Sequence, residues 1–256
     1  MMINFSDLKF RIVYWIVNKL DKFKEIHFMN YGYHDPDKSL ALENADETNR
    51  YSIQLYNHLT DMVDLKNKDI VEIGSGRGGG LSYIAKYLSP NSLKGIDLCK
   101  SAIVSSNKNN KFSNLSFHHG DAQQIPLTDN SCDVVINVES SHRYIGMDRF
   151  ISEVIRILKS GGHFLFTDFR YDYEWTEVHK LFECSGLKMI FEKDITSSVL
   201  CALNNDDLRR RTLVKKLAPA YLHEAMLNFA GCIGSQTYLF FLSRQYVYKT
   251  YAFEKL

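Results

Sequence analysis

The sequence lacks any apolar run long enough to cross a bilayer, which takes about 18 or more consecutive apolar residues. The longest early apolar run covers only residues 12–17, too short even for the apolar part of a secretory signal. With neither a span nor a leader, we expect a cytoplasmic protein. Peripheral contact with a membrane surface stays open.

A surplus of charge is also missing, since 31 lysines and arginines face 30 aspartates and glutamates and leave a formal net charge of +1. Proteins that bind nucleic acid neutralise phosphates with a basic surplus. We therefore expect no nucleic-acid partner.

Paired cysteines and metal motifs are absent as well. The five cysteines are scattered, odd in number and without a C-x-x-C pair, which indicates reduced thiols. The sequence contains no H-E-x-x-H, Walker A or G-x-S-x-G pattern. The adjacent His118 and His119 have no third ligand at a suitable spacing, so we expect no metal site.

From residue 70 onward, short runs rich in β-formers alternate with helical patterns. Strands are expected at 70–73, 93–97, 115–118, 132–138, 163–168 and 187–191, with helices at 81–88, 101–108, 150–158 and 174–184. This alternation predicts an α/β fold with a parallel sheet covered on both faces. Ligands of such folds bind at the carboxyl ends of the strands.

Two further regions depart from this rhythm. Apolar residues recur at helical spacing over 5–27, and a second helix is expected over about 40–59. The first helix is read either as a membrane-surface or partner helix or as a cover over the protein's own core. Residues 197–243 are expected to form a helical insertion, with a helix start at 203–207, a solvated basic face at 209–211 and an apolar stripe over 213–229. Residues 246–253 should form the last strand.

These patterns predict four parts. They are an N-terminal helical cap (1–60), a ligand-binding core (61–196), a helical lid insertion (197–243) and the final strand of the core sheet (244–256). The cap and the insertion are both rich in aromatic and aliphatic residues. We expect them to roof a pocket for an apolar ligand.

A glycine-rich loop follows the first strand of the core, where residues 71–80 read Val-Glu-Ile-Gly-Ser-Gly-Arg-Gly-Gly-Gly. Glycines let the backbone turn tightly and expose amide groups at a helix N-terminus. Gly74, Gly76 and Gly79 fit a dinucleotide fingerprint, whereas Gly74, Gly76 and Gly78 fit a methyltransferase one. The loop alone leaves both open.

Four further features separate these readings. Glu72 lies two residues before the first glycine, and Asp97 ends the next strand, where a carboxylate can accept hydrogen bonds from both hydroxyls of a ribose. Gly120-Asp121-Ala122 follows the third strand. A fourth strand and a turn at 158–162 complete the set.

This set, in this order, resembles the class I S-adenosylmethionine (SAM)-dependent methyltransferase family over roughly residues 60–195. Ser160 stands where the family's turn usually has proline. The resemblance implies a Rossmann-like, seven-stranded, mostly parallel sheet whose last strand is antiparallel. It also implies SAM as cofactor and S-adenosylhomocysteine as product.

Residues 30–33, 137–142 and 166–170, and more weakly 234–238, resemble a small-molecule branch that includes the phthiotriolone and phenolphthiotriolone dimycocerosate O-methyltransferases. Those enzymes methylate a hydroxyl on a long lipid-like polyketide. The resemblance implies methyl transfer to a small, largely apolar acceptor. N- or C-methylation and a SAM-binding catalyst that transfers no methyl, such as a cyclase, remain alternatives. The sequence does not decide between a monomer and a homodimer.

The resemblance and the motifs together select candidate site residues. Cofactor contacts are expected from Tyr31, Glu72, Gly74, Ser75, Gly76, Gly78, Asp97, Leu98, Asp121, Ala122 and Asn137. His142 follows the fourth strand and is the candidate general base, because its ordinary pKa suits proton transfer near neutrality.

Three neighbouring residues have roles that the sequence leaves open. Glu139 is expected either to orient His142, to bind substrate, or to accept a nearby backbone N–H. Tyr33, like Tyr31, either covers the pocket or packs against the N-terminal helix. Asp168 either faces the pocket or pairs with Arg170.

Overall fold

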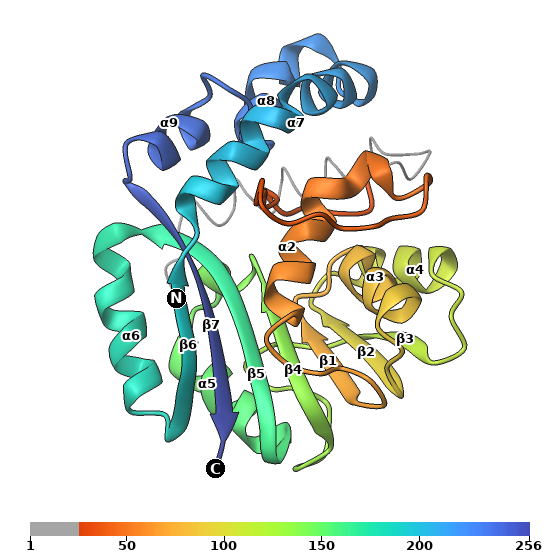
Figure 1. The fold of residues 1–256 in the computed structure, drawn as a ribbon, viewed down its shortest axis with the longest axis vertical. Coiled ribbons are helices and arrows are strands. Elements are labelled where there is room, and N and C mark those ends of the chain that lie inside the picture. Colours follow the sequence, from red (N-terminus) through yellow and green to blue (C-terminus); the bar gives the residue numbers. More distant parts are fainter. Residues whose placement is uncertain (1–25) are drawn as a thin grey trace.

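The computed structural model describes residues 26–256 as a seven-stranded sheet flanked by helices (Figure 1). The strands are β1 (Asp69–Ile73), β2 (Ser92–Asp97), β3 (Leu115–His119), β4 (Cys132–Val138), β5 (Leu158–Tyr171), β6 (Leu187–Asp194) and β7 (Tyr246–Lys255). The α-helices are α2 (Arg50–Thr60), α3 (Gly79–Tyr87), α4 (Lys100–Asn109), α5 (Met147–Ile157), α6 (Trp175–Glu183), α7 (Thr196–Leu217), α8 (His223–Phe229) and α9 (Gln236–Leu242). Short 3-10 turns are η1 (Glu47–Asn49), η2 (Ser141–Arg143), η3 (Asp172–Glu174) and η4 (Ala220–Leu222).

The strands run in the order β3-β2-β1-β4-β5-β7-β6. β1 to β5 pair in parallel, whereas β7 is antiparallel to both of its neighbours, β5 and β6. The predicted mostly parallel sheet with an antiparallel last strand is therefore confirmed.

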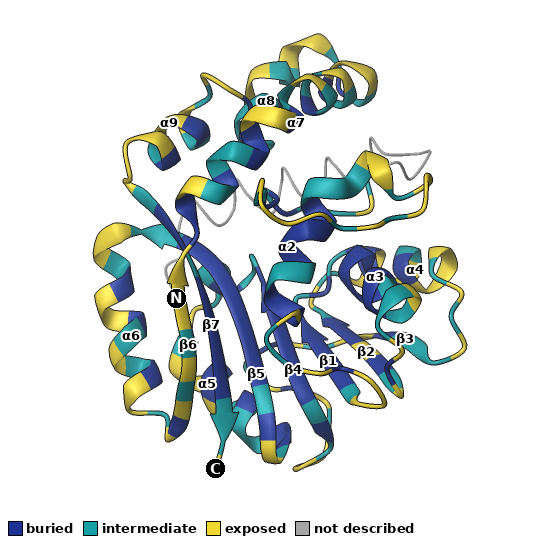
Figure 2. Cartoon of the chain, in the orientation of Figure 1, coloured by how far each residue is buried: buried dark blue, intermediate teal, exposed yellow. Residues whose placement is uncertain are grey.

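Helices cover both faces of the sheet, and the central strands are accordingly apolar along nearly their whole length. One core lies under α2, α3 and α4, and the other under α5 and α6. In α5 the buried residues Phe150, Ile151, Val154 and Ile157 recur with the helical repeat, so the helix presents one apolar stripe to β4 and β5. Figure 2 shows β4 and β5 buried and the outer surfaces of α6 and α9 exposed.

Two covers lie above the carboxyl edge of the parallel strands (Figure 1). One is the segment from residue 26 to η1, and the other is the predicted helical insertion, formed by α7, α8 and α9 between β6 and β7. No helix between residues 26 and 256 is long and apolar enough to span a membrane.

Several predicted boundaries are wrong. The helix expected over 40–59 begins only at Arg50, after a coil and η1. Residues 203–207 start no helix but lie inside α7, and the stripe over 213–229 is divided among α7, η4 and α8. The turn at 158–162 belongs to the start of β5. Nearly all of the helix predicted over 5–27 lies outside the described residues.

Candidate active site

The glycine loop joins β1 to α3 in a conformation that glycine favours. Gly74, Gly76 and Gly78 have φ angles of 77°, 50° and 79°, which residues with a Cβ rarely adopt. The amide of Gly74 donates to the Ile96 carbonyl at 2.8 Å and ties the loop to β2. A Cβ at Gly74 would collide with Oγ of Ser140, so the loop after β4 rests directly on this glycine.

Asp97 anchors the loop from the end of β2. Its Oδ2 accepts the Gly76 amide at 2.8 Å and its Oδ1 accepts the Cys99 amide at 2.8 Å. Burial raises the pKa of this carboxyl, and the two amide donors act in the opposite direction. The carboxylate keeps lone pairs for further donors such as ribose hydroxyls.

Glu72 lies fully buried in β1, directly before the loop. Its Oε1 accepts the Tyr56 hydroxyl at 2.6 Å. Burial raises the pKa of Glu72 to about 8. At neutral pH this shift favours the protonated form of the side chain.

Three buried polar atoms around the loop lack hydrogen-bond partners among residues 26–256: Oε2 of Glu72, Oγ of Ser75 and Oδ1 of Asn137. Buried polar atoms are rarely left unpaired, so such a cluster suits a polar ligand or ordered water. The amide of Asn137 donates to the Ile73 carbonyl at 2.8 Å and fixes this side chain against the end of β1. These residues fit a SAM molecule seated along the glycine loop.

The other predicted cofactor residues lie beside the carboxyl ends of β2 and β3. Leu98 is 60% exposed directly after Asp97, and Ala122 is buried. Asp121 is exposed and its Oδ1 accepts the Gln123 amide at 2.9 Å. Their contacts with a cofactor stay predictions. Among residues 26–256, no three His, Cys, Asp or Glu side chains gather as a metal site would require.

His142 lies in η2, at the carboxyl edge beyond β4, and Asp168 of β5 holds it from two sides. The ring Nδ1 lies 2.6 Å from Asp168 Oδ1, and the backbone amide of His142 donates to Oδ2 at 2.9 Å. Ser141 donates its hydroxyl to the same Oδ2 at 2.6 Å. The side chain of His142 is 11% exposed, while that of Asp168 is fully buried.

Burial and charge set the protonation of this pair. Burial lowers the pKa of His142, although Asp168 acts in the opposite direction. For Asp168, burial favours the neutral acid, but His142, Arg170 and the Ser141 hydroxyl outweigh it and lower the pKa to about 2. A neutral imidazole beside a carboxylate follows. We assign the imidazole proton to Nδ1, so the Nε2 lone pair is left available.

Glu139 does not orient His142, because its carboxyl binds other groups. Its Oε1 accepts the backbone amide of Tyr31 at 2.7 Å and the hydroxyl of Tyr248 at 2.7 Å. Burial raises the pKa of Glu139 to about 8. The residue has a left-handed backbone with φ of 45°, which turns the chain sharply after β4. Of the predicted alternatives, the contact with a nearby backbone amide is the one found.

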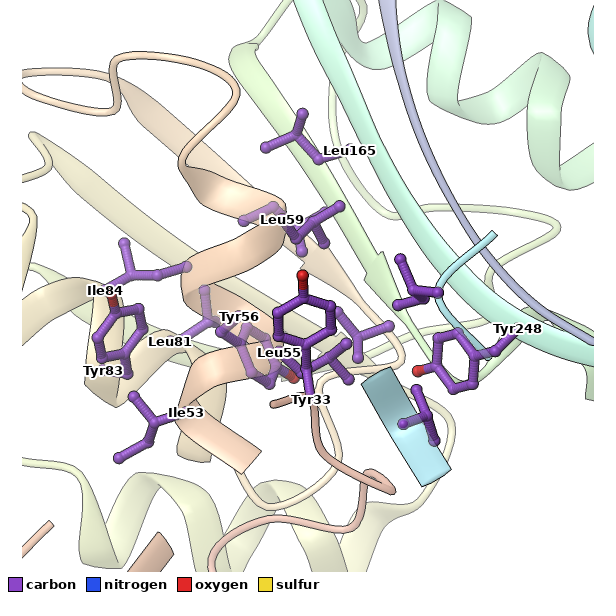
Figure 3. Packing of buried hydrophobic residues seen from close by; sticks show 14 of the residues in the cluster. Tyr33, Ile53, Leu55, Tyr56, Leu59, Leu81, Tyr83, Ile84, Leu165 and Tyr248 are labelled. Atoms are coloured by element: carbon purple, nitrogen blue, oxygen red, sulfur yellow. The ribbon is translucent and has the colours of Figure 1, made fainter. Parts of the chain in front are cut away.

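The two loop tyrosines have separate places. The ring of Tyr31 packs edge-on against Phe169 and Phe241, each at 5.3 Å between centroids, and Phe169 contacts His142 at 4.4 Å. Tyr33 is 3% exposed, stacks on His58 at 4.3 Å and lies among the hydrophobic side chains of α2 (Figure 3). Tyr31 therefore borders His142 through Phe169, whereas Tyr33 belongs to the core.

The basic run at 209–211 is only in part a solvated face, because its middle residue is buried. Arg210 is buried in α7, and its guanidinium binds Asp206 at 2.9 Å, the Ala230 carbonyl at 2.9 Å and the Tyr31 carbonyl at 3.0 Å. It thus joins the insertion to the loop that Glu139 holds. The spacing of Asp206 and Arg210 by four residues was the available signal for this pair. No sequence pattern indicated that Arg210 binds the Ala230 and Tyr31 carbonyls.

The chain is similar to several known proteins. Residues 71–166 match the model of a family described as a methyltransferase domain. The chain is 37% identical over 232 residues to a phthiotriol/phenolphthiotriol dimycocerosates methyltransferase of Mycobacterium tuberculosis, covering 90% of this chain and 86% of that protein. It is 36% identical over 215 residues to a fatty-acid O-methyltransferase of Mycolicibacterium smegmatis, covering 84% and 78%.

Among solved structures, the geranyl diphosphate C-methyltransferase from Streptomyces coelicolor A3(2), crystallised with S-adenosyl-L-homocysteine, has the same fold. The TM-score is 0.69 at 14% identity, with 100% of each chain covered. The chain belongs to the class I SAM-dependent methyltransferase family, in the small-molecule branch with the phthiotriol/phenolphthiotriol dimycocerosates methyltransferases. It is a SAM-dependent methyltransferase, and the predicted family, fold, activity and cofactor are confirmed.

Proposed function

We propose that this enzyme methylates a hydroxyl oxygen of a small, largely apolar, lipid- or polyketide-like acceptor, with His142 as the general base. The 2.6 Å contact between His142 Nδ1 and Asp168 Oδ1 carries the proposal. The names of the two mycobacterial relatives, which point to lipid-like substrates, support the class of acceptor.

A bound SAM supplies an electrophilic methyl group. An attacking hydroxyl must lose its proton, and a positioned base contributes about 10²–10⁴-fold to such a step. The Nε2 lone pair of His142 accepts that proton. Asp168, with a pKa of about 2, remains ionised and stabilises the imidazolium that forms, without taking the proton itself.

The side chains beside His142 favour an apolar acceptor. Phe169 contacts its ring, and Tyr31 and Phe241 pack against Phe169. Large aromatic faces bind hydrocarbon and exclude water. This wall orients the apolar part of an acceptor and leaves its hydroxyl to the imidazole.

For the cofactor, we propose the contacts predicted from the motifs. The glycine loop and Ser75 hold the amino-acid end together with Asn137, and Asp97 accepts the ribose hydroxyls. Asp121 and Ala122 bind the adenine, with Leu98 against its face. Glu72 supports the loop from below. Tyr31 closes the acceptor side.

Two acceptors of similar shape test the base directly. A long-chain alcohol must be deprotonated, whereas a fatty acid is already ionised at neutral pH and needs no base. His142→Gln should lower turnover of the alcohol about 10²–10⁴-fold and leave methylation of the acid nearly unchanged. Release of S-adenosylhomocysteine measures both reactions, and SAM titration checks that the cofactor still binds.

The control is His179→Ala, a histidine on α6 outside the site. It should retain both activities. Asp168→Asn should follow His142→Gln, because the imidazole then loses its partner. Equal losses on alcohol and acid would show that His142 shapes the pocket and takes no proton.

We further propose a cytoplasmic enzyme acting as a monomer or homodimer. All five cysteines are free thiols, which fits a reducing compartment. Light scattering of the purified protein distinguishes the two assembly states, and cell fractionation tests the compartment.

A further inference from the structure

An exposed aromatic ring begins a strip that leads inward from the surface. Tyr173 lies in η3, directly after β5, and is 74% exposed. Its ring stacks on Tyr171, with 5.5 Å between centroids and 15° between planes. The ring of Tyr173 is therefore held by its neighbour and is available for contact with an apolar ligand.

The strip continues from ring to ring as far as His142. Tyr171 contacts Tyr246 at 4.7 Å, Tyr246 contacts Phe169 at 5.2 Å, and Phe169 contacts His142 at 4.4 Å. Tyr171 and Tyr246 are each half-buried. Each of these two rings therefore keeps part of its apolar surface accessible.

Helix α9 borders the same strip. Its Phe240 contacts Tyr171 at 5.9 Å and Tyr246 at 5.1 Å. Two of its leucines, Leu239 and Leu242, are 45% and 57% exposed. Figure 2 shows exposed surface along this helix. Phe240 thus adds an apolar ring from α9 to this strip.

We propose that this aromatic strip (Phe169, Tyr246, Tyr171 and Tyr173) holds the apolar chain of the acceptor, from the hydroxyl at His142 outward to Tyr173. The inference rests on the proposed function. Continuity with His142 decides the occupant, because each ring contacts the next and the inner end meets the base. An acceptor with a short chain would reach only the inner rings.

The outer ring therefore sets selectivity for chain length. Removing Tyr173 takes contact area from a long chain and none from a short one. We expect Tyr173→Ser to lower kcat/KM for 1-dodecanol about tenfold, which corresponds to about 1.4 kcal/mol. The value for 1-butanol should stay within twofold. Tyr173→Trp, which restores a large ring, should recover the long-chain rate.

The matched control is Tyr221→Ser, which removes a ring that is 84% exposed but lies in η4, outside the strip. It should change neither rate. If Tyr173→Ser lowers kcat/KM equally for both alcohols, or for neither, the proposed role of the strip is refuted.

Binding of 1-dodecanol, measured by titration calorimetry without turnover, separates this inference from the proposed function. The wild type could bind 1-dodecanol but methylate neither 1-dodecanol nor 1-butanol. If Tyr173→Ser then weakens binding, the role of the strip is supported and the proposed hydroxyl acceptor is wrong. If binding is unchanged by Tyr173→Ser, the strip is refuted whatever the activity.

Discussion

Replacing Arg210 by methionine should separate the helical insertion from the loop over the active site. The guanidinium makes charge-assisted contacts with the part-buried Ala230 and Tyr31 carbonyls and pairs with the buried Asp206. Methionine keeps much of the apolar stem and removes every one of these bonds. Hydrogen bonds of charged groups contribute about 1.5–3 kcal/mol each.

The loss of stability is smaller than the summed contributions of these bonds, because Asp206 keeps Arg209 as a second partner at 2.6 Å. We expect the free energy of unfolding to fall by about 3 kcal/mol, most of it from carbonyls left without donors. The free energy of unfolding of Arg210→Lys should lie between those of the wild type and Arg210→Met. An ammonium cannot span partners on three segments as a planar guanidinium does.

Arg209→Met is the matched control. Arg209 pairs with the same aspartate but is 31% exposed and contacts no carbonyl among residues 26–256, so its loss should cost at most about 1 kcal/mol. Denaturant unfolding gives the free energies of unfolding of the three variants, and unchanged m-values check for two-state behaviour. Exchange of the Tyr31 amide should accelerate only in the Arg210 variants. Similar costs for Arg209→Met and Arg210→Met would refute the reasoning.

Three further predictions concern the glycine loop and the two titrating groups. Gly74→Ala should abolish SAM binding in calorimetry, because the new methyl group would collide with Ser140. The rate with a hydroxyl acceptor should rise with pH through the pKa of His142, which burial places below the ordinary 6.5, and then level off. The free energy of unfolding should fall as pH rises from about 4.3 to about 8, because the folded protein keeps a proton on Glu139 that the unfolded chain releases. Denaturant unfolding at several pH values should show a smaller decline for Glu139→Gln.

Each of these has its own control. Gly161 has φ of 72° with nothing within 4 Å of an added Cβ, so Gly161→Ala carries backbone strain without a collision and should still bind SAM. His142→Gln should flatten the rise of the rate with pH. A rate that falls across that range would mean that the imidazolium is the active form. Identical slopes of stability against pH in Glu139→Gln and wild type would place the proton elsewhere.

The sheet and the cofactor loop were predictable because their signals are local. A strand between two covered faces is an apolar run, and a backbone with positive φ at residues 74, 76 and 78 favours glycine in the sequence itself. The position of His142 at the carboxyl edge was predictable because it follows a recognisable strand. Each of these signals lies within one short stretch of sequence.

The partners of these residues were harder to predict, since contacts distant in sequence decide them. Asp168 lies 26 residues from His142, and Arg210 lies 179 residues from Tyr31. The basic run at 209–211 has the composition of a solvated face, and only tertiary packing buries its middle residue. Likewise residues 40–46 remain outside a helix while Asp46 binds Lys86 and Tyr87 of α3.

The contacts of Arg210 have a consequence for how the family can diverge. Its partners at Ala230 and Tyr31 are main-chain oxygens, which every amino acid supplies. Substitutions along both partner segments therefore leave these two hydrogen-bond acceptors in place. Side chains around the proposed acceptor site can change in this way without removing the two hydrogen bonds that dock the insertion on the loop of Tyr31.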